Sequence, residues 1–147
     1  MITRETDYAL RLLRTLRDGE RRTAAEAAER GMVPVAFAYK ILKKLAKAGF
    51  VEIARGVEGG CRLTADLEQL TLYDLVIAMG EHCRLSGCMD PGYQCSWRSE
   101  HGGCAVHCHL AKIQEKLDQE LRTHSLKEIL CERVCFFTLK LDKNYQD

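Results

Sequence analysis

The stretch that decides the fold runs from Pro34 to Leu63 and reads PVAFAYKILKKLAKAGFVEIARGVEGGCRL. Pro34 suits the first turn of a helix and Gly49 suits its C-terminal stop, so a helix is expected from residue 34 to about residue 48. Alternating apolar and polar residues at 50–54 predict a short strand, and a glycine-rich turn precedes a second strand at 61–63. The stretch therefore predicts a helix followed by a β-hairpin.

Two further helices are expected before this stretch. The first covers residues 7–17, where apolar side chains recur at helical spacing, and Asp18-Gly19 ends it. The second follows a capping-box pattern of Thr23 and Glu26 and stops at Gly31. Three short helices, the last two joined by a tight turn, have the layout of a helix-turn-helix, and the hairpin adds a wing.

The chain beyond the hairpin is expected to hold three helices and one long loop. Thr71 caps a helix that ends at Gly80, and residues 81–103 show no periodicity, so we expect no regular structure there. A long helix is expected at 104–122, and Ser125 opens a last helix with a capping box. The long helix carries a seam-like stripe of Val106, Leu110, Ile113, Leu117 and Leu121. We expect this stripe to pair with its copy in a dimer, and an intrachain core is the alternative.

The charge of the chain is unevenly distributed. Among 147 residues, Lys and Arg total 22 and Asp and Glu total 21, for a formal net charge of +1. Residues 1–64 carry +5, residues 65–110 carry −4 and residues 111–147 are neutral. A basic first part favours a polyanion as partner, and a solvated basic face is the alternative. Hydrophobic residues make up 46%, which suffices for a core and excludes wholesale disorder.

The helix expected at 34–48 has two opposite faces, one apolar and one rich in lysine. Lysines release counterions from phosphate, and residues in the first turn would face base edges in a major groove. A guanidinium beside glycines at the hairpin tip fits a narrow minor groove. These features favour DNA binding over a solvated lysine face. The expected contacts are Ala36, Phe37, Lys40, Lys43, Lys44, Arg55 and Gly59.

Eight cysteines are present, and five of them crowd into residues 83–108. The N-terminus has no apolar signal-peptide region, so we expect the reducing cytosol, where thiols serve metals or redox chemistry. No C-x2-C occurs, so the usual zinc signature is absent. The spacing leaves open a metal or cluster site, a disulfide switch or inert thiols. Cys61 is expected on a hairpin strand, and Cys131 and Cys135 are interpreted as buried packing thiols.

Three strings in this chain match a known family pattern. They are Thr6-Asp7-Tyr8-Ala9-Leu10-Arg11, the stretch Leu45 to Leu63 with Cys61 in place of the usual aromatic, and Leu70-Thr71-Leu72-Tyr73-Asp74 continuing to Gly80-Glu81. They resemble the winged-helix regulators that include IscR, NsrR, RirA and CymR (the Rrf-two family). The resemblance implies a homodimeric transcription factor that binds a palindromic operator. The helix carrying Phe37 and Lys40 would enter the major groove, and the Arg55 wing the minor groove.

The resemblance also implies an iron–sulfur cluster, either 2Fe-2S or 4Fe-4S. In the cluster-binding members the last cluster cysteine opens the long helix, 21 residues before the capping Ser or Thr, which matches Cys104. The gaps between the cysteines here, six and eight residues, depart from the family's usual gaps. The implied ligands are Cys88, Cys95, Cys104 and His107, with Cys108, or Asp7 of the partner subunit, as the alternative fourth ligand. A structural role for Asp7 is the competing interpretation.

We therefore expect a mainly α fold: a winged helix-turn-helix with a small β-hairpin wing and a long C-terminal dimerisation helix. Residues 1–80 would form the DNA-binding domain, residues 81–103 a Cys-rich cluster-binding loop, and residues 104–147 the dimerisation helix and the C-terminal helix. No apolar run approaches the ~20 residues that span a bilayer, so we expect no membrane association.

The expected function is a cytoplasmic, homodimeric regulator that binds double-stranded DNA and senses iron–sulfur status, redox state or nitric oxide through its cluster. One alternative is a regulator of the same fold without a cluster, which would sense thiol oxidation, small molecules or partner proteins. Structural zinc is a further alternative. The chain has no phosphate loop, zinc-protease helix, nucleophile elbow or thioredoxin-like C-x-x-C, so an enzyme is not expected.

Overall fold

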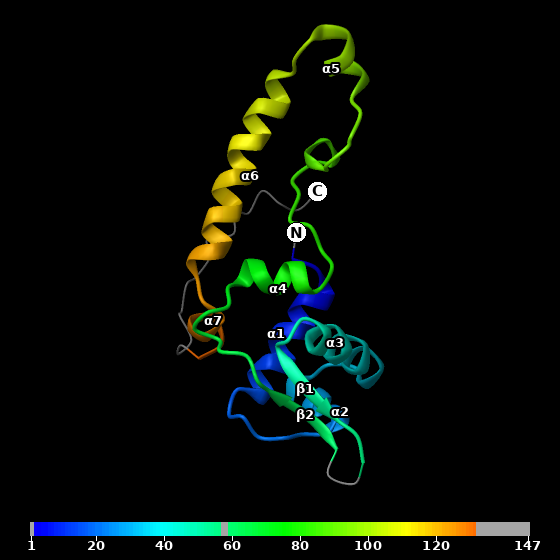
Figure 1. Ribbon diagram of the computed structural model, residues 1–147, viewed down its shortest axis with the longest axis vertical. Helices are drawn as coiled ribbons and strands as arrows, with labels where there is room; N and C mark the ends of the chain where they lie inside the picture. Colours follow the sequence, from blue (N-terminus) through cyan, green and yellow to red (C-terminus); the bar gives the residue numbers. More distant parts are fainter. Residues whose placement is uncertain (1, 57–58, 132–147) are drawn as a thin grey trace, which may run out of the picture.

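The computed structural model describes residues 2–56 and 59–131 of the chain. Its first part contains α1 (Arg4–Leu16), α2 (Ala24–Gly31), α3 (Val35–Lys47), β1 (Val51–Ala54), β2 (Gly60–Leu63) and α4 (Leu72–Ala78). It continues with η1 (Gly87–Met89), α5 (Ser96–His101), α6 (Ala105–Thr123) and α7 (Leu126–Cys131). Three mutually packed helices followed by an antiparallel hairpin confirm the expected mainly α, winged helix-turn-helix fold (Figure 1).

The predicted capping boxes lie at the starts of three helices and explain where those helices begin. In each pair a hydroxyl accepts from a backbone N–H three residues later, and the carboxylate there accepts from the N–H of the capping residue. The pairs are Thr23 with Glu26, Thr71 with Asp74, and Ser125 with Glu128. α1 begins at Arg4, earlier than expected, because the Thr3 hydroxyl accepts from the Glu5 N–H and supplies an N-cap.

One hydrophobic core joins the helices to the hairpin. The apolar stripes of α1 and α3 are fully buried, as their spacing predicts, and each large side chain contributes about 1.5–3 kcal/mol by leaving water. α7 returns to this core, because Leu126 and Leu130 are buried in it and the Leu126 N–H donates to the Leu70 carbonyl at 2.7 Å. The largest buried side chains are Leu12, Leu13, Leu16, Ile41, Leu42, Leu45, Leu75, Met79 and Leu126.

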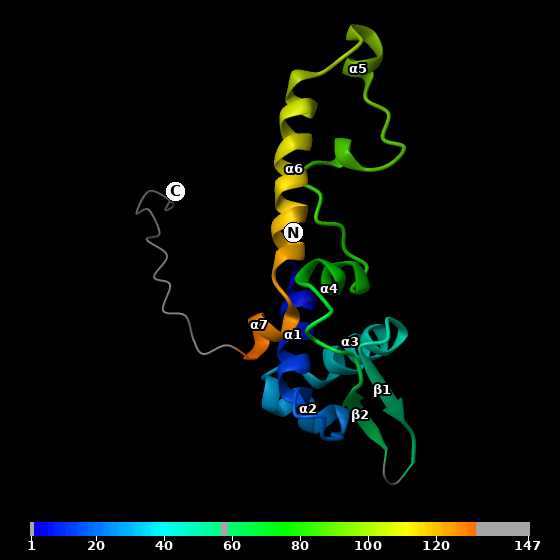
Figure 2. The ribbon, with the colours of Figure 1, turned by 60° about the vertical axis from the view of Figure 1, so that its left-hand side comes forward.

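An arm formed by α6 and the Cys-bearing segment, residues 81–104, projects from this helical body (Figures 1 and 2). The expectation that residues 81–103 lack regular structure is wrong in part. The Asp90 N–H closes η1 on the Gly87 carbonyl at 3.0 Å, and α5 begins with a bond from the Ser99 N–H to the Cys95 carbonyl at 3.0 Å. These short helices are held by local backbone hydrogen bonds and bury no apolar stripe, so the sequence shows no apolar periodicity there.

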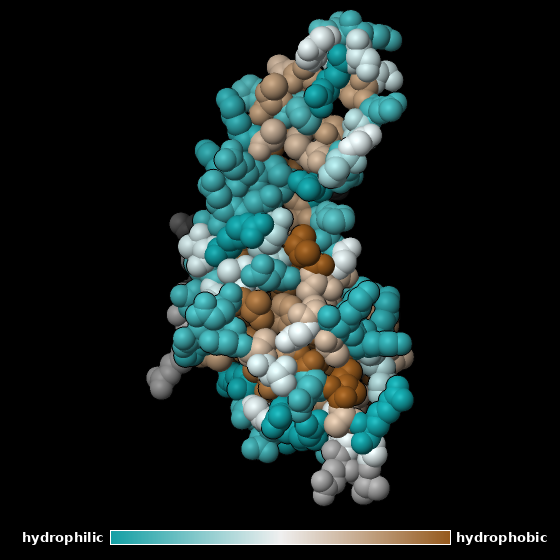
Figure 3. Space-filling view, viewed as in Figure 1, coloured by the Kyte–Doolittle hydropathy of each residue, from teal (hydrophilic) through white to brown (hydrophobic). Residues whose placement is uncertain are grey.

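The stripe expected on α6 is partly in solvent: Leu110, Leu117 and Leu121 are half-buried, and the other two residues are exposed. Val106 is 65% exposed and Ile113 is 53% exposed, so these two apolar side chains are not covered within the described residues. Figure 3 shows the outer edges of the molecule as mostly hydrophilic, with apolar side chains gathered along its middle. No helix in residues 2–56 or 59–131 combines the length and apolar character needed to cross a membrane.

Candidate functional site

The solvent face of α3 carries the side chains expected to contact DNA. Ala36 is exposed, and Phe37 is 44% exposed with its ring edge-on to that of Tyr8, at a centroid distance of 5.8 Å. Lys43 is exposed and has no ion pair within the described part of the chain. α3 thus presents an aromatic anchor in its first turns and at least one free ammonium group, which suits a groove lined by phosphates.

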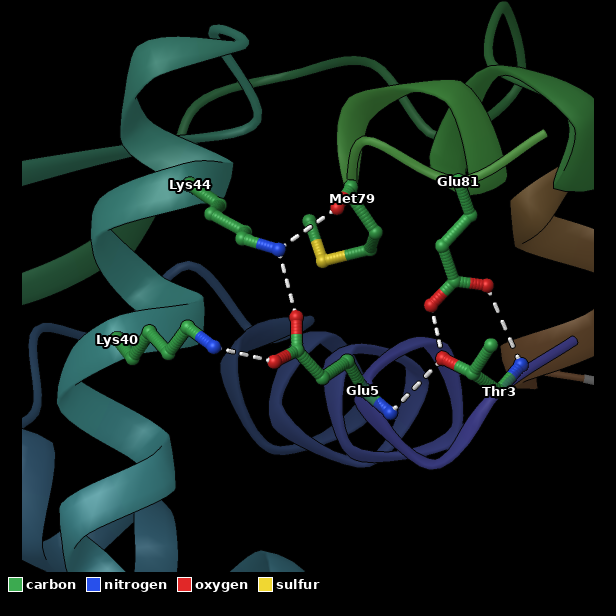
Figure 4. A network of polar contacts seen from close by, with 6 residues as sticks. All are labelled: Thr3, Glu5, Lys40, Lys44, Met79 and Glu81. Carbon is green, nitrogen blue, oxygen red and sulfur yellow. Dashed lines mark hydrogen bonds and ion pairs between the residues drawn. The ribbon is translucent and has the colours of Figure 1, made fainter.

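Two other lysines of this face are engaged within the chain (Figure 4). Lys40 Nζ donates to one Glu5 carboxylate oxygen at 2.6 Å, and Lys44 Nζ donates to the other at 2.6 Å. Lys44 also donates to the Met79 carbonyl at 2.7 Å. The hydrogen bonds from Lys40 and then Lys44 hold the pKa of Glu5 below its usual value. Sequence reasoning missed Glu5, because only packing of α1 against α3 brings it here.

The hairpin is fixed to the body by backbone bonds. The Arg22 N–H donates to the Cys61 carbonyl at 2.9 Å, and the Cys61 N–H donates to the Arg22 carbonyl at 2.7 Å. The Arg22 side chain is buried and pairs with Asp18. The Cys61 thiol donates to the Arg22 carbonyl at 3.2 Å, and burial raises its pKa. Cys61 therefore lies on the strand, as expected, and serves packing.

Arg55 and Gly59 occupy the tip of this hairpin. Arg55 is exposed and has no ion pair in the described residues. Gly59 is needed for the hairpin itself, because a Cβ there would lie 2.7 Å from the Gly56 carbonyl oxygen and 2.9 Å from that of Ala54. The close approach explains this glycine by backbone geometry. Contact of either residue with DNA stays a prediction.

The predicted ligand cysteines lie within or directly before successive short and long helices. Cys88 lies in η1, Cys95 is the N-cap of α5 and Cys104 is the N-cap of α6, and all three thiols are free and half-buried. Cys83 is buried and Cys108 is exposed. Within residues 2–56 and 59–131, no three side chains of His, Cys, Asp or Glu lie close enough to hold one metal ion. The structure therefore does not bring the predicted ligand set together.

Cys104 and His107 do lie together, on the first turn of α6. The Cys104 sulfur accepts from the His107 backbone N–H at 3.4 Å. The His107 Nδ1 atom is buried and has no hydrogen-bond partner in the described part of the chain. A buried imidazole nitrogen without a hydrogen-bond partner normally lowers the stability of the fold. The same turn therefore carries a soft sulfur donor and an unused imidazole nitrogen, which are donor types found in iron and zinc sites.

Two other predictions about this region have different outcomes. Asp7 pairs with Arg11 at 3.0 Å on α1, which supports a structural role, and its role as a ligand stays a prediction. The expectation that Cys131 is buried is wrong, because Leu126 and Leu130 turn the core-facing side of α7 inward and Cys131 follows on the exposed side. Cys135 lies outside the described residues.

A buried amide that no sequence pattern indicated connects the Cys-bearing segment to α6. Gln114 is 5% exposed, and its Nε2 donates to the Cys83 carbonyl and to Asp118, the latter at 2.8 Å. Its Oε1 accepts from the Leu85 N–H at 2.8 Å. Gln114 thus hydrogen-bonds the backbone carbonyl of the residue before Arg84 and the backbone N–H of the residue after it. A neighbouring β-strand would bond to the same two backbone groups.

Comparisons with known proteins agree with this architecture. Residues 2–132 match the family model described as Rrf2, an iron-dependent transcriptional regulator. Protein aau3 of Rhizobium meliloti is 34% identical over 93 residues, which cover 62% of this chain and 60% of that protein. The transcriptional regulator NsrR of Bacillus subtilis is 32% identical over 92 residues, covering 60% of this chain and 63% of NsrR. Each match spans less than two thirds of the relative.

Solved structures share the fold. The IscR structure of T. potens superimposes with a TM-score of 0.63 at 16% identity, covering 88% of this chain and 85% of IscR. The oxidized form of CymR from Staphylococcus aureus has a TM-score of 0.66 at 19% identity, covering 92% of this chain and 99% of CymR. The family match extends from the first described residue through α7, so the chain belongs to the Rrf2 family of DNA-binding transcriptional regulators, not to a family of enzymes.

Proposed function

We propose that this regulator acts as a homodimer that binds a palindromic operator and senses iron–sulfur status, redox state or nitric oxide through an iron–sulfur cluster. The observation that carries the proposal is the first turn of α6, where the Cys104 sulfur accepts from the His107 backbone N–H and the ring nitrogen Nδ1 of His107 is buried with no hydrogen-bond partner among the described residues. If His107 had only a structural role, this nitrogen would have no partner, whereas a bound metal would be its partner.

The exposed face of α6 supports the dimer. Val106 and Ile113 leave an apolar stripe in solvent on a 19-residue helix, and a second copy would bury it by coiled-coil-like packing. A two-fold dimer presents two copies of α3, whose half-sites are expected about one helical turn of DNA, or a multiple of it, apart. α3 and the Arg55-bearing hairpin would then read the major and minor grooves of each half-site.

The ligands proposed for the cluster are Cys88, Cys95, Cys104 and His107, with Cys108 or the partner's Asp7 as the alternative fourth ligand. When bound, such a cluster supplies a redox-active group whose net charge changes with its oxidation state. A neutral imidazole from His107 in place of a fourth thiolate would make the bound cluster less negative. Because no three candidate ligand side chains of the described residues are grouped around one metal position, binding would require the 81–103 segment to change conformation so that the four donors meet.

The cluster proposal is tested by purifying the protein anaerobically, measuring iron and sulfide, and recording visible and Mössbauer spectra. We expect bound iron in the wild type, its loss in Cys104→Ala, and full retention in the control Cys131→Ala, whose thiol is exposed on α7. His107→Ala is expected to change the redox potential or the stability of the cluster. Loss of iron in Cys108→Ala with an unchanged His107→Ala would make Cys108 the fourth ligand. A colourless wild type without iron contradicts the proposal.

The thiols offer a second candidate function without a cluster, because Cys88, Cys95 and Cys104 are free and partly exposed within one segment. In that case a two-electron oxidant such as a peroxide would take two electrons and two protons from a pair of these thiols, and the resulting disulfide would change DNA affinity while no iron is bound. Mass spectrometry of the oxidised, iron-free protein detects this disulfide.

The operator and the dimer are tested separately. Selection of bound duplexes from a random library tests the operator, since a dimer enriches sequences with two-fold symmetry. Light scattering measures the oligomeric state.

A further inference from the structure

The only carboxylate bonded to α3 lysines in the described residues is that of Glu5, and it uses both of its oxygens to do so (Figure 4). One carboxylate and two ammonium groups leave a net charge of +1 where Lys40 and Lys44 alone would present +2. Glu5 is half-buried on the first turn of α1, with 25% of its side chain exposed. It is therefore held close to α3, and both lysines reach it within hydrogen-bond distance.

The position of Glu5 is itself fixed from the other side. The Thr3 N–H donates to the Glu81 carboxylate at 3.2 Å, and the Thr3 hydroxyl donates to the same carboxylate. Thr3 is the N-cap of α1, so this contact holds the turn on which Glu5 lies. Glu81 opens the Cys-bearing segment, and α1 and α3 share the hydrophobic core. Glu5 is thus a placed group and not a mobile surface carboxylate.

The two lysines differ in what they can still do. Lys44 has 33% of its side chain exposed, and its ammonium group is bonded both to Glu5 and to the Met79 carbonyl. Lys40 has 60% of its side chain exposed, and Glu5 is its only bonded partner in the described part of the chain. Lys44 therefore serves as an anchor between α3 and α4. Lys40 is the ammonium group that a DNA phosphate could take from Glu5.

We propose that Glu5 limits the DNA affinity of this regulator, because its carboxylate competes with DNA phosphate for Lys40. The inference rests on the proposed placement of α3 against DNA. Lysine contacts with phosphate supply most non-specific affinity, and each one adds about 0.9 to the salt slope and about five- to tenfold in affinity at 0.1 M salt. An internal carboxylate that holds Lys40 suppresses this sequence-independent contribution and leaves base contacts to decide where the protein binds.

The test measures binding to a labelled duplex of random sequence by fluorescence anisotropy between 50 and 200 mM KCl. Glu5→Gln is expected to bind about five- to tenfold more tightly at 0.1 M salt, with a salt slope steeper by about 0.9, because it frees Lys40. The gain is expected to vanish in the double variant Glu5→Gln/Lys40→Ala, measured against Lys40→Ala alone. Glu120→Gln, which removes the same charge from an exposed site on α6, is expected to leave both quantities unchanged.

The double variant separates this inference from a general charge effect. Loss of a negative charge near DNA raises affinity whether or not a lysine is released. If Glu5→Gln therefore produces the same gain in the Lys40→Ala background as in the wild type, the effect is a general electrostatic one and the competition for Lys40 is overturned. An unchanged affinity and salt slope in Glu5→Gln also overturn it. Far-UV circular dichroism shows whether Glu5→Gln is folded.

Two variants keep the inference testable if Glu5→Gln does not fold. In the wild-type background, Lys40→Ala is expected to lower the salt slope by less than Lys43→Ala, because Lys43 is exposed and has no carboxylate partner within the described residues. A loss as large as that of Lys43→Ala overturns the inference. If Lys43→Ala leaves the slope unchanged while the wild type binds the duplex, the placement of α3 on DNA is wrong, and the inference is overturned with it.

Discussion

Replacement of Gln114 by alanine is expected to detach the base of the Cys-bearing segment from α6. The amide makes one bond to the Cys83 carbonyl and one to the Leu85 N–H, and Gln114 is almost fully buried. Each neutral hydrogen bond contributes about 1 kcal/mol, and a buried group left without a partner costs about 1–3 kcal/mol. We therefore expect Gln114→Ala to destabilise this attachment by about 2–4 kcal/mol.

Hydrogen exchange measures this attachment at a single amide. The Leu85 N–H donates to Gln114, so its exchange reports the opening of that contact. A loss of 2 kcal/mol corresponds to roughly 30-fold faster exchange, and a larger loss to more. The matched control is Gln119→Ala, because Gln119 lies exposed on the same helix and its side chain makes no bond in the described residues. We expect Leu85 exchange in that control to equal the wild type.

The reasoning is refuted if Leu85 exchanges in Gln114→Ala as slowly as in the wild type. It is also refuted if amides of the helical body accelerate by the same factor, because the change would then be one of global stability. The amide of Leu42, on the buried face in the middle of α3, serves as that reference. A selective change at Leu85 identifies Gln114 as the link between the thiols and α6.

Three further predictions concern the helical body. Asp18→Asn should make the stability of the fold less dependent on acidic pH. Arg22 holds the pKa of Asp18 well below its usual range, so the pair stabilises the fold above about pH 4 and this stabilisation is lost as pH falls. Urea titrations at several pH values measure the effect. In the native protein, iodoacetamide should label the exposed Cys108 much faster than Cys61, whose pKa burial raises, as mass spectrometry would detect. Thr71→Ala should lower the free energy of unfolding by about 1 kcal/mol in urea denaturation, because it removes the cap of α4.

The sequence predicted the helical body well because its signals are local. The stretch from Pro34 to Leu63 carries helical periodicity, a stop and strand alternation within 30 residues, and each appears in α3, β1 and β2. The capping boxes at Thr23, Thr71 and Ser125 depend on residues three apart, so tertiary packing has little to change.

The candidate site was less predictable because its contacts join residues far apart in the chain. Glu5 lies 35 residues from Lys40, and Gln114 lies 31 residues from Cys83. Periodicity placed four lysines on one face of α3, but it contains no information about which carboxylate packs opposite them. The resemblance to known regulators supplied the ligand register of Cys104 and His107, and the structure adds the unpartnered nitrogen.

The base of the Cys-bearing segment is where the segment proposed above to sense is joined to the winged helix-turn-helix. Between Met79 and Leu85 the chain contacts α3 through Lys44, α1 through Thr3, and α6 through Gln114. Met79, Cys83 and Leu85 make these hydrogen bonds with backbone atoms and Glu81 makes its own with its carboxylate, so a displacement of this base must break or move at least one of them. A conformational change in the 81–103 segment therefore reaches the turn that holds Glu5 against Lys40. If the thiols sense as proposed above, the charge presented by α3, and not only the spacing of two copies of α3 in the proposed dimer, would therefore depend on their state.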